Sequence, residues 1–247
     1  MRLLLTSICV FFTVISSTFA QQGMVESNLA KEIVLFEATS YRAATEFNVH
    51  AMQKDKKSEQ ALFDVLAKGD QLSSLFKQQS TELAPSWNKY RTFIWDKHSQ
   101  AKSNIDTYVF NDMRILHKDL LDIVVKIKKQ VNSDLLPAKD LNKVNAVLLI
   151  EQLASEYLEI SAATFGVFGF AGSDQAIQIE VRSQAFEHVI AELKKIYAED
   201  AIKLKAVNKL ALRWRFIKST LLAYNERSAP FAVAKTVGYI RKQLAEI

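Results

Sequence analysis

The sequence predicts an all-α fold of long helices, and three observations support this prediction. The 247 residues include only six Gly and three Pro, so signals that end helices or form turns are rare. Ala, Leu, Lys, Glu and Gln, which favour helices, dominate the composition. Apolar residues recur at steps of three, four and seven, the spacing of one helix face. We therefore expect about seven to eight helices in two consecutive antiparallel, up-down bundles that form an elongated array.

The first 20 residues have the pattern of a cleavable signal peptide. Arg2 precedes an apolar run from Leu3 to Ile15, and Thr18-Phe19-Ala20 ends the segment with a Thr-x-Ala pattern. The run is shorter than the roughly 20 residues of a membrane span. We expect cleavage near Ala20 and a periplasmic or secreted protein, with an uncleaved N-terminal anchor as the alternative. Since Cys9 lies in the apolar run, the mature chain would contain no disulfide.

Four helices are predicted before the main break in the chain. Ser27 is a candidate cap for a helix that reaches Lys54. The next two helices are predicted to begin at Ser58 and, after Pro85, at Ser86. A fourth follows Ser103-Asn104 and reaches Ile127. Gly69 is a candidate kink in the second of these helices.

The segment Asn132–Pro137 is the clearest break, because Pro disfavours helix in the residue before it. It separates a predicted N-terminal bundle, residues 21–134, from a C-terminal bundle, residues 138–247. Helices of the second bundle are expected at 140–170, from Ser173 or Asp174 to Tyr197, at 200–225, and from Pro230 onward. Pro230 suits a first helical turn, where its missing N–H is not needed.

The two halves share a weak internal similarity. Glu37 precedes Ala43-Ala44-Thr45 by six residues, and Glu156 precedes Ala162-Ala163-Thr164 by the same interval. The segment that begins at Trp87 is similar to the one that begins at Trp214. These similarities predict a tandem repeat, and a single irregular helical array remains the alternative. The large apolar residues expected to anchor the core are Phe36, Phe47, Trp87, Phe93, Phe110, Phe168, Phe186, Trp214, Phe216 and Phe231.

No segment matches a common catalytic or nucleotide-binding template. The chain lacks a Gly-x-Gly-x-x-Gly loop, a Walker loop and a Gly-x-Ser-x-Gly elbow. No His has Glu three residues before it, as a di-iron bundle requires. Glu46 and His50 are four residues apart and predict a solvated pair at a helix end, with a lone metal site as the alternative. Glu151, Glu156 and Glu159 share a predicted helix without an opposing acid. We therefore expect no enzyme activity and no cofactor or metal.

Two segments are candidate contact sites. The densest basic stretch runs from Lys203 to Lys218 and predicts a solvated helix face or a docking face for an anionic partner or a lipid headgroup. The apolar stretch from Phe165 to Phe170 predicts a core helix end, with an exposed hydrophobic contact or the lip of a ligand pocket as the alternatives. The net charge of +5 is mild for this length and does not indicate nucleic-acid binding. The candidate partner or ligand residues are Phe165, Phe168, Phe170, Lys205, Lys209, Arg213 and Arg215.

The last 40 residues contain a motif shared with a known family. Trp214-Arg215-Phe216 is followed by Ala229-Pro230-Phe231-Ala232-Val233-Ala234 and by Tyr239-Ile240. This order resembles the end of the helical N-terminal domain of type IV pilus methyl-accepting chemotaxis transducers. That family is related in organisation to the periplasmic sensor domains of nitrate-responsive histidine kinases. The resemblance is best over Asn208–Ile247 and implies an exported helical sensor module.

The start of the chain departs from the family pattern. Asn28-Leu29-Ala30 matches the family's opening, but Lys31–Phe36 replaces the arginine-rich segment that follows. In the sensor kinases, arginines of that segment bind the anion, whereas here no arginine lies between Lys31 and Tyr41 and the first to follow is Arg42. A nitrate-like site is therefore not implied. The family's membrane span and signalling region have no counterpart, so the resemblance implies signalling through a partner.

These observations predict a non-enzymatic, exported sensory or ligand-binding accessory protein that acts through a membrane-bound receptor or envelope protein. The alternative is a structural or interaction protein of the cell envelope without a small ligand. In either case the sequence indicates no nucleic-acid partner, and it identifies neither the ligand nor the oligomeric state.

Overall fold

The computed structural model describes the backbone of residues 3–99, 107–131, 136–164, 173–224, 226 and 228–247. It describes the side chains of these ranges except those of residues 3–26, 107, 163–164 and 173–177. The described residues form eight α-helices and no strand, which confirms the all-α class. The helices are α1 (Leu3–Gln53), α2 (Lys56–Ser74), α3 (Leu83–His98), α4 (Thr107–Gln130), α5 (Ala138–Thr164), α6 (Ser173–Ile196), α7 (Ala201–Leu222) and α8 (Pro230–Glu246).

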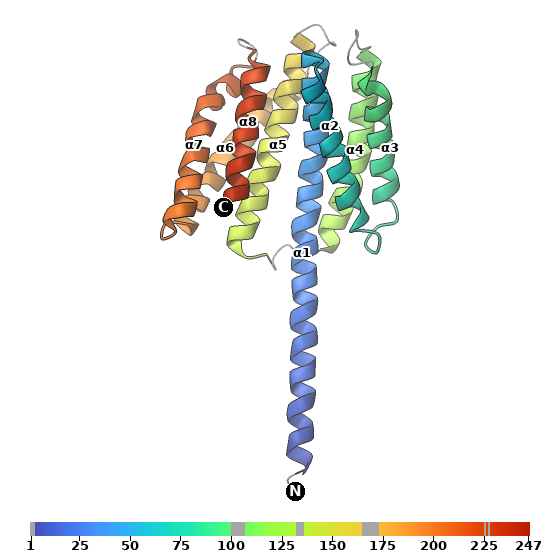
Figure 1. Ribbon diagram of the computed structural model, residues 1–247, viewed down its shortest axis with the longest axis vertical. Coiled ribbons are helices and arrows are strands. Elements are labelled where there is room, and N and C mark those ends of the chain that lie inside the picture. Colours follow the sequence, from blue (N-terminus) through green and yellow to red (C-terminus); the bar gives the residue numbers. More distant parts are fainter. Residues whose placement is uncertain (1–2, 100–106, 132–135, 165–172, 225, 227) are drawn as a thin grey trace.

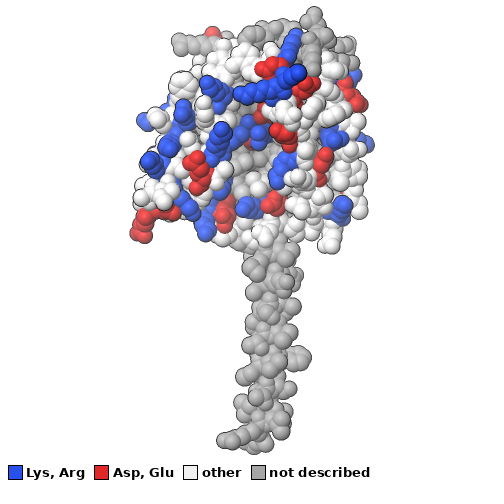
Figure 2. Space-filling view, in the orientation of Figure 1, with Lys and Arg blue, Asp and Glu red and all other residues white. Residues whose placement is uncertain are grey.

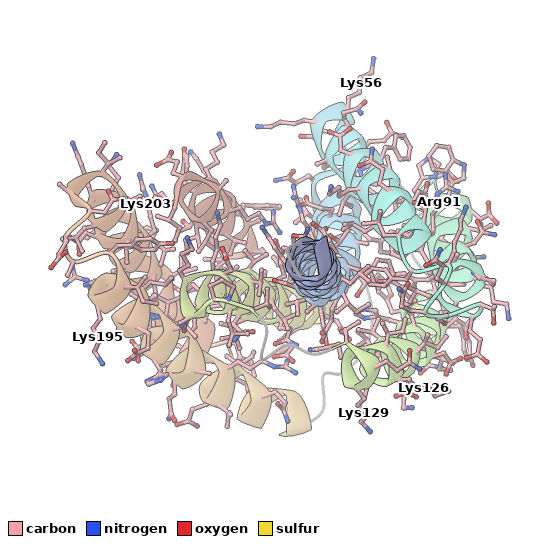
Figure 3. The ribbon with its side chains drawn as sticks, turned by 90° about the horizontal axis from the view of Figure 1, so that it is seen from below. Lys56, Arg91, Lys126, Lys129, Lys195 and Lys203 are labelled. Atoms are coloured by element: carbon pink, nitrogen blue, oxygen red, sulfur yellow. The ribbon has the colours of Figure 1, made fainter. Side chains whose placement is uncertain are left out.

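The helices form two up-down sets that lie side by side, α1–α4 and α5–α8 (Figure 1). We call them the first and second sets. α1 and α5 run in the same direction and pack against each other at the centre. The view along α1 shows α2 and α8 on one face of this central pair and α4 and α6 on the other (Figure 3). The N-terminal part of α1 extends beyond the bundles. Among the residues described, no helix is long and apolar enough to cross a membrane.

Three predicted helix starts in the first set were wrong. α1 begins at Leu3 and continues through Ser27 to Gln53, so Ser27 lies inside the helix and not at its start. The cap of α2 is Asp55, whose carboxylate accepts a hydrogen bond from the Ser58 amide at 2.7 Å. Pro85 lies in the first turn of α3, where its missing N–H is tolerated, so Ser86 is inside the helix.

The predicted helix starts of the second set agree better with the structure. α5 follows Pro137 directly, and α8 begins at Pro230. The carboxylate of Asp200 accepts a hydrogen bond from the Lys203 amide at 3.0 Å and caps α7. The expected helix end at Phe170 lies outside the described residues.

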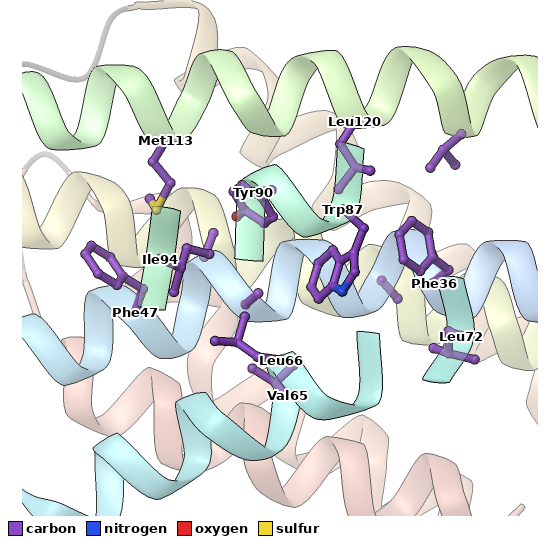
Figure 4. Close-up of a cluster of buried hydrophobic side chains, with 14 of the residues drawn as sticks. Phe36, Phe47, Val65, Leu66, Leu72, Trp87, Tyr90, Ile94, Met113 and Leu120 are labelled. Atoms are coloured by element: carbon purple, nitrogen blue, oxygen red, sulfur yellow. The ribbon is translucent and has the colours of Figure 1, made fainter. Parts of the chain in front are cut away.

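Trp87 is at the centre of the core of the first set (Figure 4). Its ring meets Phe36 of α1 edge to face at a centroid distance of 5.6 Å. Its indole N–H donates to Asp70 of α2 at 2.8 Å. Gly69 is buried beneath the ring, since a Cβ atom there would lie 2.0 Å from Trp87 Cζ2. Gly69 therefore permits close packing of α2 against α3 and is not explained as a kink.

The second set repeats this arrangement around Trp214. Its indole N–H donates to Glu187 of α6 at 3.3 Å, and Lys218, four residues later, pairs with the same carboxylate at 2.7 Å. In the first set Arg91, four residues after Trp87, pairs with Asp70 at 2.9 Å. In each set, a Trp and a basic residue of the third helix thus both contact one carboxylate of the second helix. This shared geometry supports the predicted duplication.

The two cores meet between α1 and α5. Val144, Leu148 and Ala162 of α5 belong to the first core, and Val49 of α1 belongs to the second. The two sets therefore stabilise each other by burial of apolar surface across the central pair.

Most predicted core anchors are buried, and two are not. Phe36, Phe47, Trp87, Phe110, Phe186 and Trp214 are buried, Phe93 is partly buried, and Phe168 is outside the described residues. Phe216 is exposed because Trp214 and Ile217 occupy the inward positions of that turn of α7. Phe231 is exposed because Pro230 and Val233 take the inward positions of α8.

Candidate functional site

A cleft of about 540 Å³ lies between the two sets, where α8 faces α1, α2 and the turn between them. We call it the interbundle cleft. Its volume is in the ~300–1,000 Å³ range of small-molecule sites. The first set contributes Glu46, Val49, Gln53, Asp55, Lys57, Ser58 and Ala61, and α8 contributes Phe231, Ala234, Lys235, Gly238, Tyr239 and Lys242.

A buried ion-pair network adjoins this cleft through Glu46, which belongs to the lining, and we call this side the base of the cleft. Arg241 of α8 donates from Nε and Nη2 to the Glu151 carboxylate of α5 at 2.7 and 2.6 Å. Its Nη1 donates to Glu46 of α1 at 2.9 Å. The side chains of Arg241, Glu46 and Glu151 are only 17%, 10% and 4% exposed. The network therefore joins α8, α5 and α1, and it connects the two sets.

The charges of this network are mutually compensated. Burial lowers the pKa of Arg241, but the charges and hydrogen bonds of Glu151 and Glu46 outweigh burial and raise that pKa above its ordinary value. Arg42, also on α1, adds a second cation 3.4 Å from Glu46 Oε1. Two arginines and two glutamates give no net charge, so the base of the cleft offers no free carboxylate.

The walls of the cleft have a basic excess. Lys57, Lys235 and Lys242 are exposed at the cleft, and Asp55 is the remaining acid of the lining. The carboxylate of Asp55 is used by the Ser58 amide, whose hydrogen bond lowers the pKa of Asp55. Figure 2 shows that Lys and Arg also gather over α7 and α8 on this face of the molecule. Such a lining attracts anions.

The cleft also has an apolar wall and free space. Phe231 and Tyr239 are partly exposed and belong to the lining, as do Val49 and Ala234. A Cβ atom at Gly238 would have nothing within 4 Å, so this part of the α8 wall is open. The lining can therefore bind a small anion through its lysines and an attached apolar group through its aromatic rings.

The predicted solvated pair of Glu46 and His50 was wrong. Both side chains are buried, and Glu46 binds Arg241. His50 Nδ1 lies 2.9 Å from Ser58 Oγ, which donates its own proton to the Asp55 carbonyl oxygen at 2.8 Å. His50 therefore donates to Ser58 and links α1 to α2. In the described part of the chain, no group of three His, Cys, Asp or Glu is placed to hold a metal.

The opposite face of the central pair is closed by ion pairs. Lys128 of α4 binds Glu37 of α1 at 2.9 Å. Arg114 of α4 pairs with Glu159 of α5, and Arg182 of α6 pairs with Glu156 of α5. The helix carrying Glu151, Glu156 and Glu159 thus supplies three carboxylates that each bind an arginine. These contacts hold α4 and α6 against the central pair and leave the interbundle cleft as the open side.

His117 of α4 is neutral, and its contacts indicate a structural role. Burial lowers its pKa to about 4. Its ring stacks on Tyr90 at a centroid distance of 5.1 Å and meets Tyr41 edge to face at 4.8 Å. Ser40 Oγ lies 2.9 Å from His117 Nε2 and donates its proton to the Glu37 carbonyl oxygen at 2.8 Å. Ser40 therefore accepts from His117, which is the reverse of a nucleophile activated by a base.

The structure does not bring the predicted site residues together at the cleft. Lys205, Lys209, Arg213 and Arg215 lie on the exposed side of α7. Phe165, Phe168 and Phe170 lie outside the described residues. One contact connects α7 with the cleft, because the Arg213 guanidinium lies over the Tyr239 ring at 4.7 Å.

Sequence reasoning missed the residues that build the cleft. Arg241 and Glu46 are 195 positions apart, and Arg241 and Glu151 are 90 positions apart. No local spacing can pair residues at such distances. A weak signal was present in α8, where Arg241 directly follows the buried Ile240 and Gly238 interrupts a helix of good helix formers.

Comparisons with protein families, with curated proteins and with solved structures found no match for this chain. The resemblance to pilus chemotransducer sensor domains therefore stays a prediction.

Proposed function

We propose that this protein is an exported, non-enzymatic ligand-binding module. It binds a small anion that carries an apolar group and passes the binding event to a membrane-bound partner. The observation that carries the proposal is the interbundle cleft, with three lysines and two aromatic rings above the buried Arg241 network. Export and the sensory role follow from the N-terminal pattern and the C-terminal resemblance, and the cleft supplies a place for the ligand.

The position of the cleft supports a role in signalling. Its walls belong to different sets, so a ligand that contacts Lys57 of α2 and Lys235 of α8 would draw the two sets together. Arg241 would respond to such a shift, because it is the α8 residue that binds both central helices. A small helix movement of this kind can change a surface read by a partner.

The test is a screen for ligands that stabilise the mature chain, followed by a variant that fills the cleft. The probes are acetate, succinate, L-aspartate, L-glutamate, benzoate and phenylacetate, measured by thermal shift and then by calorimetry. We expect the anions with apolar groups to raise the melting temperature, because a ligand that binds only the folded state stabilises it.

The cleft-filling variant is Gly238→Leu. The new side chain enters open space, and Leu favours helix over Gly, so the variant should fold. It should lose ligand binding, whereas Ala245→Leu, which adds the same side chain at an exposed position of α8, should retain it. If both variants bind the ligand with equal affinity, the ligand does not bind in the interbundle cleft.

A structural or interaction protein without a small ligand is the second candidate function. The observation that favours it is the exposed apolar and basic surface of α7. If no probe binds the mature chain, this second function is the better account.

A further inference from the structure

α7 presents an unusual outward face, at a distance from the base of the cleft. Ile202, Leu212 and Phe216 are 83%, 58% and 67% exposed, although the neighbouring Trp214 and Ile217 are buried. Lys205 and Lys209 lie between them at the same helical spacing, with steps of three and four. We call these five residues the α7 stripe. Three large apolar side chains aligned on one helix are the pattern of a helix-packing seam.

The charge of α7 is of one sign. The helix carries six basic residues and no acidic residue between Ala201 and Leu222. Lys218 pairs with the carboxylate of Glu187, and Lys203 and Arg213 lie over the rings of Tyr197 and Tyr239 at 5.1 and 4.7 Å. Lys205, Lys209, Arg213 and Arg215 do not pair with a carboxylate within the described residues.

Arg213 and Arg215 lie on opposite sides of the α7 stripe. Arg213 is turned toward α8, where it covers Tyr239. Arg215 lines a groove between α6 and α7 together with Glu187 and Trp214. Leu212 and Phe216 therefore lie between two arginines. A shallow depression beside Lys205, Lys209 and Leu212 continues the stripe toward the start of the helix.

We propose that the α7 stripe docks an amphipathic helix of another protein whose apolar side chains are flanked by acidic residues. The stripe from Ile202 to Phe216 is about 21 Å long, which matches about four turns of a partner helix. The partner's apolar residues would cover Leu212 and Phe216, and its carboxylates would meet the four unpaired cations.

The geometry favours this occupant over two others. A second copy of the same face would bring four cations against four cations, which charge repulsion opposes. A membrane surface takes up a broad apolar face, whereas the α7 stripe is a single line interrupted by Lys205 and Lys209. A partner helix fits such a line, because side chains at these steps pack along one seam.

The first test uses the mature chain and a synthetic peptide of three heptads, about 21 residues, with Leu at the seam positions and Glu on both flanks. Binding is followed by fluorescence anisotropy at low and high salt. We expect the Glu peptide to bind and to weaken with salt, and we expect no binding of a peptide with Lys on the flanks. Lys205→Glu with Lys209→Glu should weaken binding at least about tenfold, as should Leu212→Ser with Phe216→Ser.

The matched control is the pair Lys126→Glu and Lys129→Glu on α4, which changes the same charge at exposed positions of the other set. It should leave the peptide affinity unchanged. Equal binding of the Lys-flanked and Glu-flanked peptides would overturn the proposal. So would a lack of any peptide binding.

Two further measurements distinguish the other occupants. The first measures sedimentation of the mature chain with vesicles of phosphatidylcholine and phosphatidylglycerol. The proposal is refuted if the mature chain binds these vesicles, the α7 variants abolish that binding, and the Glu peptide does not compete with the vesicles. A dimer in solution that the same variants dissociate would refute it in favour of a second copy. Because α7 lies outside the ligand cleft, the failure of this proposal leaves Gly238→Leu as an independent test of ligand binding.

Discussion

The two glycines that the structure describes in α2 and α8 should respond in opposite ways to the same substitution by Ala. At Gly69 a Cβ atom would lie 2.0 Å from the buried ring of Trp87. Ordinary contact begins at 3.4 Å, so the ring or the helix must move by about 1.4 Å. At Gly238 the same Cβ atom meets nothing within 4 Å.

The expected free energies follow from this difference. Overpacking of a core costs about 1–3 kcal/mol, and displacement of the Trp87 indole from Asp70 costs about 1 kcal/mol more. The gain in helix propensity from Gly to Ala is about 1 kcal/mol. Gly69→Ala should therefore destabilise the protein by about 1–3 kcal/mol, and Gly238→Ala should stabilise it by up to about 1 kcal/mol.

Urea unfolding followed by circular dichroism measures both effects on the mature chain. In a chain of this size, 1 kcal/mol changes the melting temperature by about 2–4 °C, so thermal unfolding gives an independent reading. The reasoning is refuted if Gly69→Ala is as stable as the wild type. It is also refuted if both variants change stability in the same direction.

Three further predictions concern charge and backbone strain. Arg241→Met should cost about 3–5 kcal/mol at neutral pH, because Glu151 stays buried without a cation and Glu46 keeps only the half-exposed Arg42 at 3.4 Å. Urea unfolding at pH 7 measures this cost, and a free energy of unfolding equal to that of the wild type would contradict it. The pKa of His117 is about 4 in the folded state and 6.5 in the unfolded state, so the stability that its neutral ring contributes is complete above pH 6.5 and is lost as pH falls toward 4. His117→Gln should therefore flatten the dependence of the unfolding free energy on pH between pH 6.5 and pH 4, and leave that dependence unchanged at other pH values. Lys54 has a φ of 58°, in the left-handed region that strains residues other than Gly. Lys54→Gly should therefore raise the free energy of unfolding by up to about 1 kcal/mol, and a loss of stability in urea unfolding would contradict this prediction.

The elements of this fold could be predicted because helix formation is signalled locally. The scarcity of Gly and Pro and the apolar spacing predicted the class, and Asp200 and Pro230 marked two helix starts within about one residue. The helix predicted from residue 140 begins two residues earlier, at Ala138. A predicted helix start was wrong where two nearby residues can both cap the same helix. Ser58 and Asp55 are both good caps, and only the backbone geometry shows that Asp55 accepts the amide hydrogen bond.

Burial was harder to predict than helix position. Phe216 and Trp214 are both large and two residues apart, so they cannot share one face of a helix. The sequence does not say which of them points inward, and the structure buries Trp214 against Phe186. Glu46 was expected in solvent because charge is rarely buried, yet its partner Arg241 comes from the far end of the chain. Pairs of this kind depend on tertiary structure alone.

The interbundle cleft and the α7 stripe are connected through Tyr239. Tyr239 contributes to the wall of the interbundle cleft, and its ring is covered by Arg213, which flanks the α7 stripe. A ligand that packs against Tyr239 would change the position of the ring, and the cation above it would follow because the attraction depends on that geometry. Arg241, two residues later, ties the same part of α8 to α1 and α5. Ligand binding and partner docking would therefore be coupled through one turn of α8, and each would change the affinity of the other.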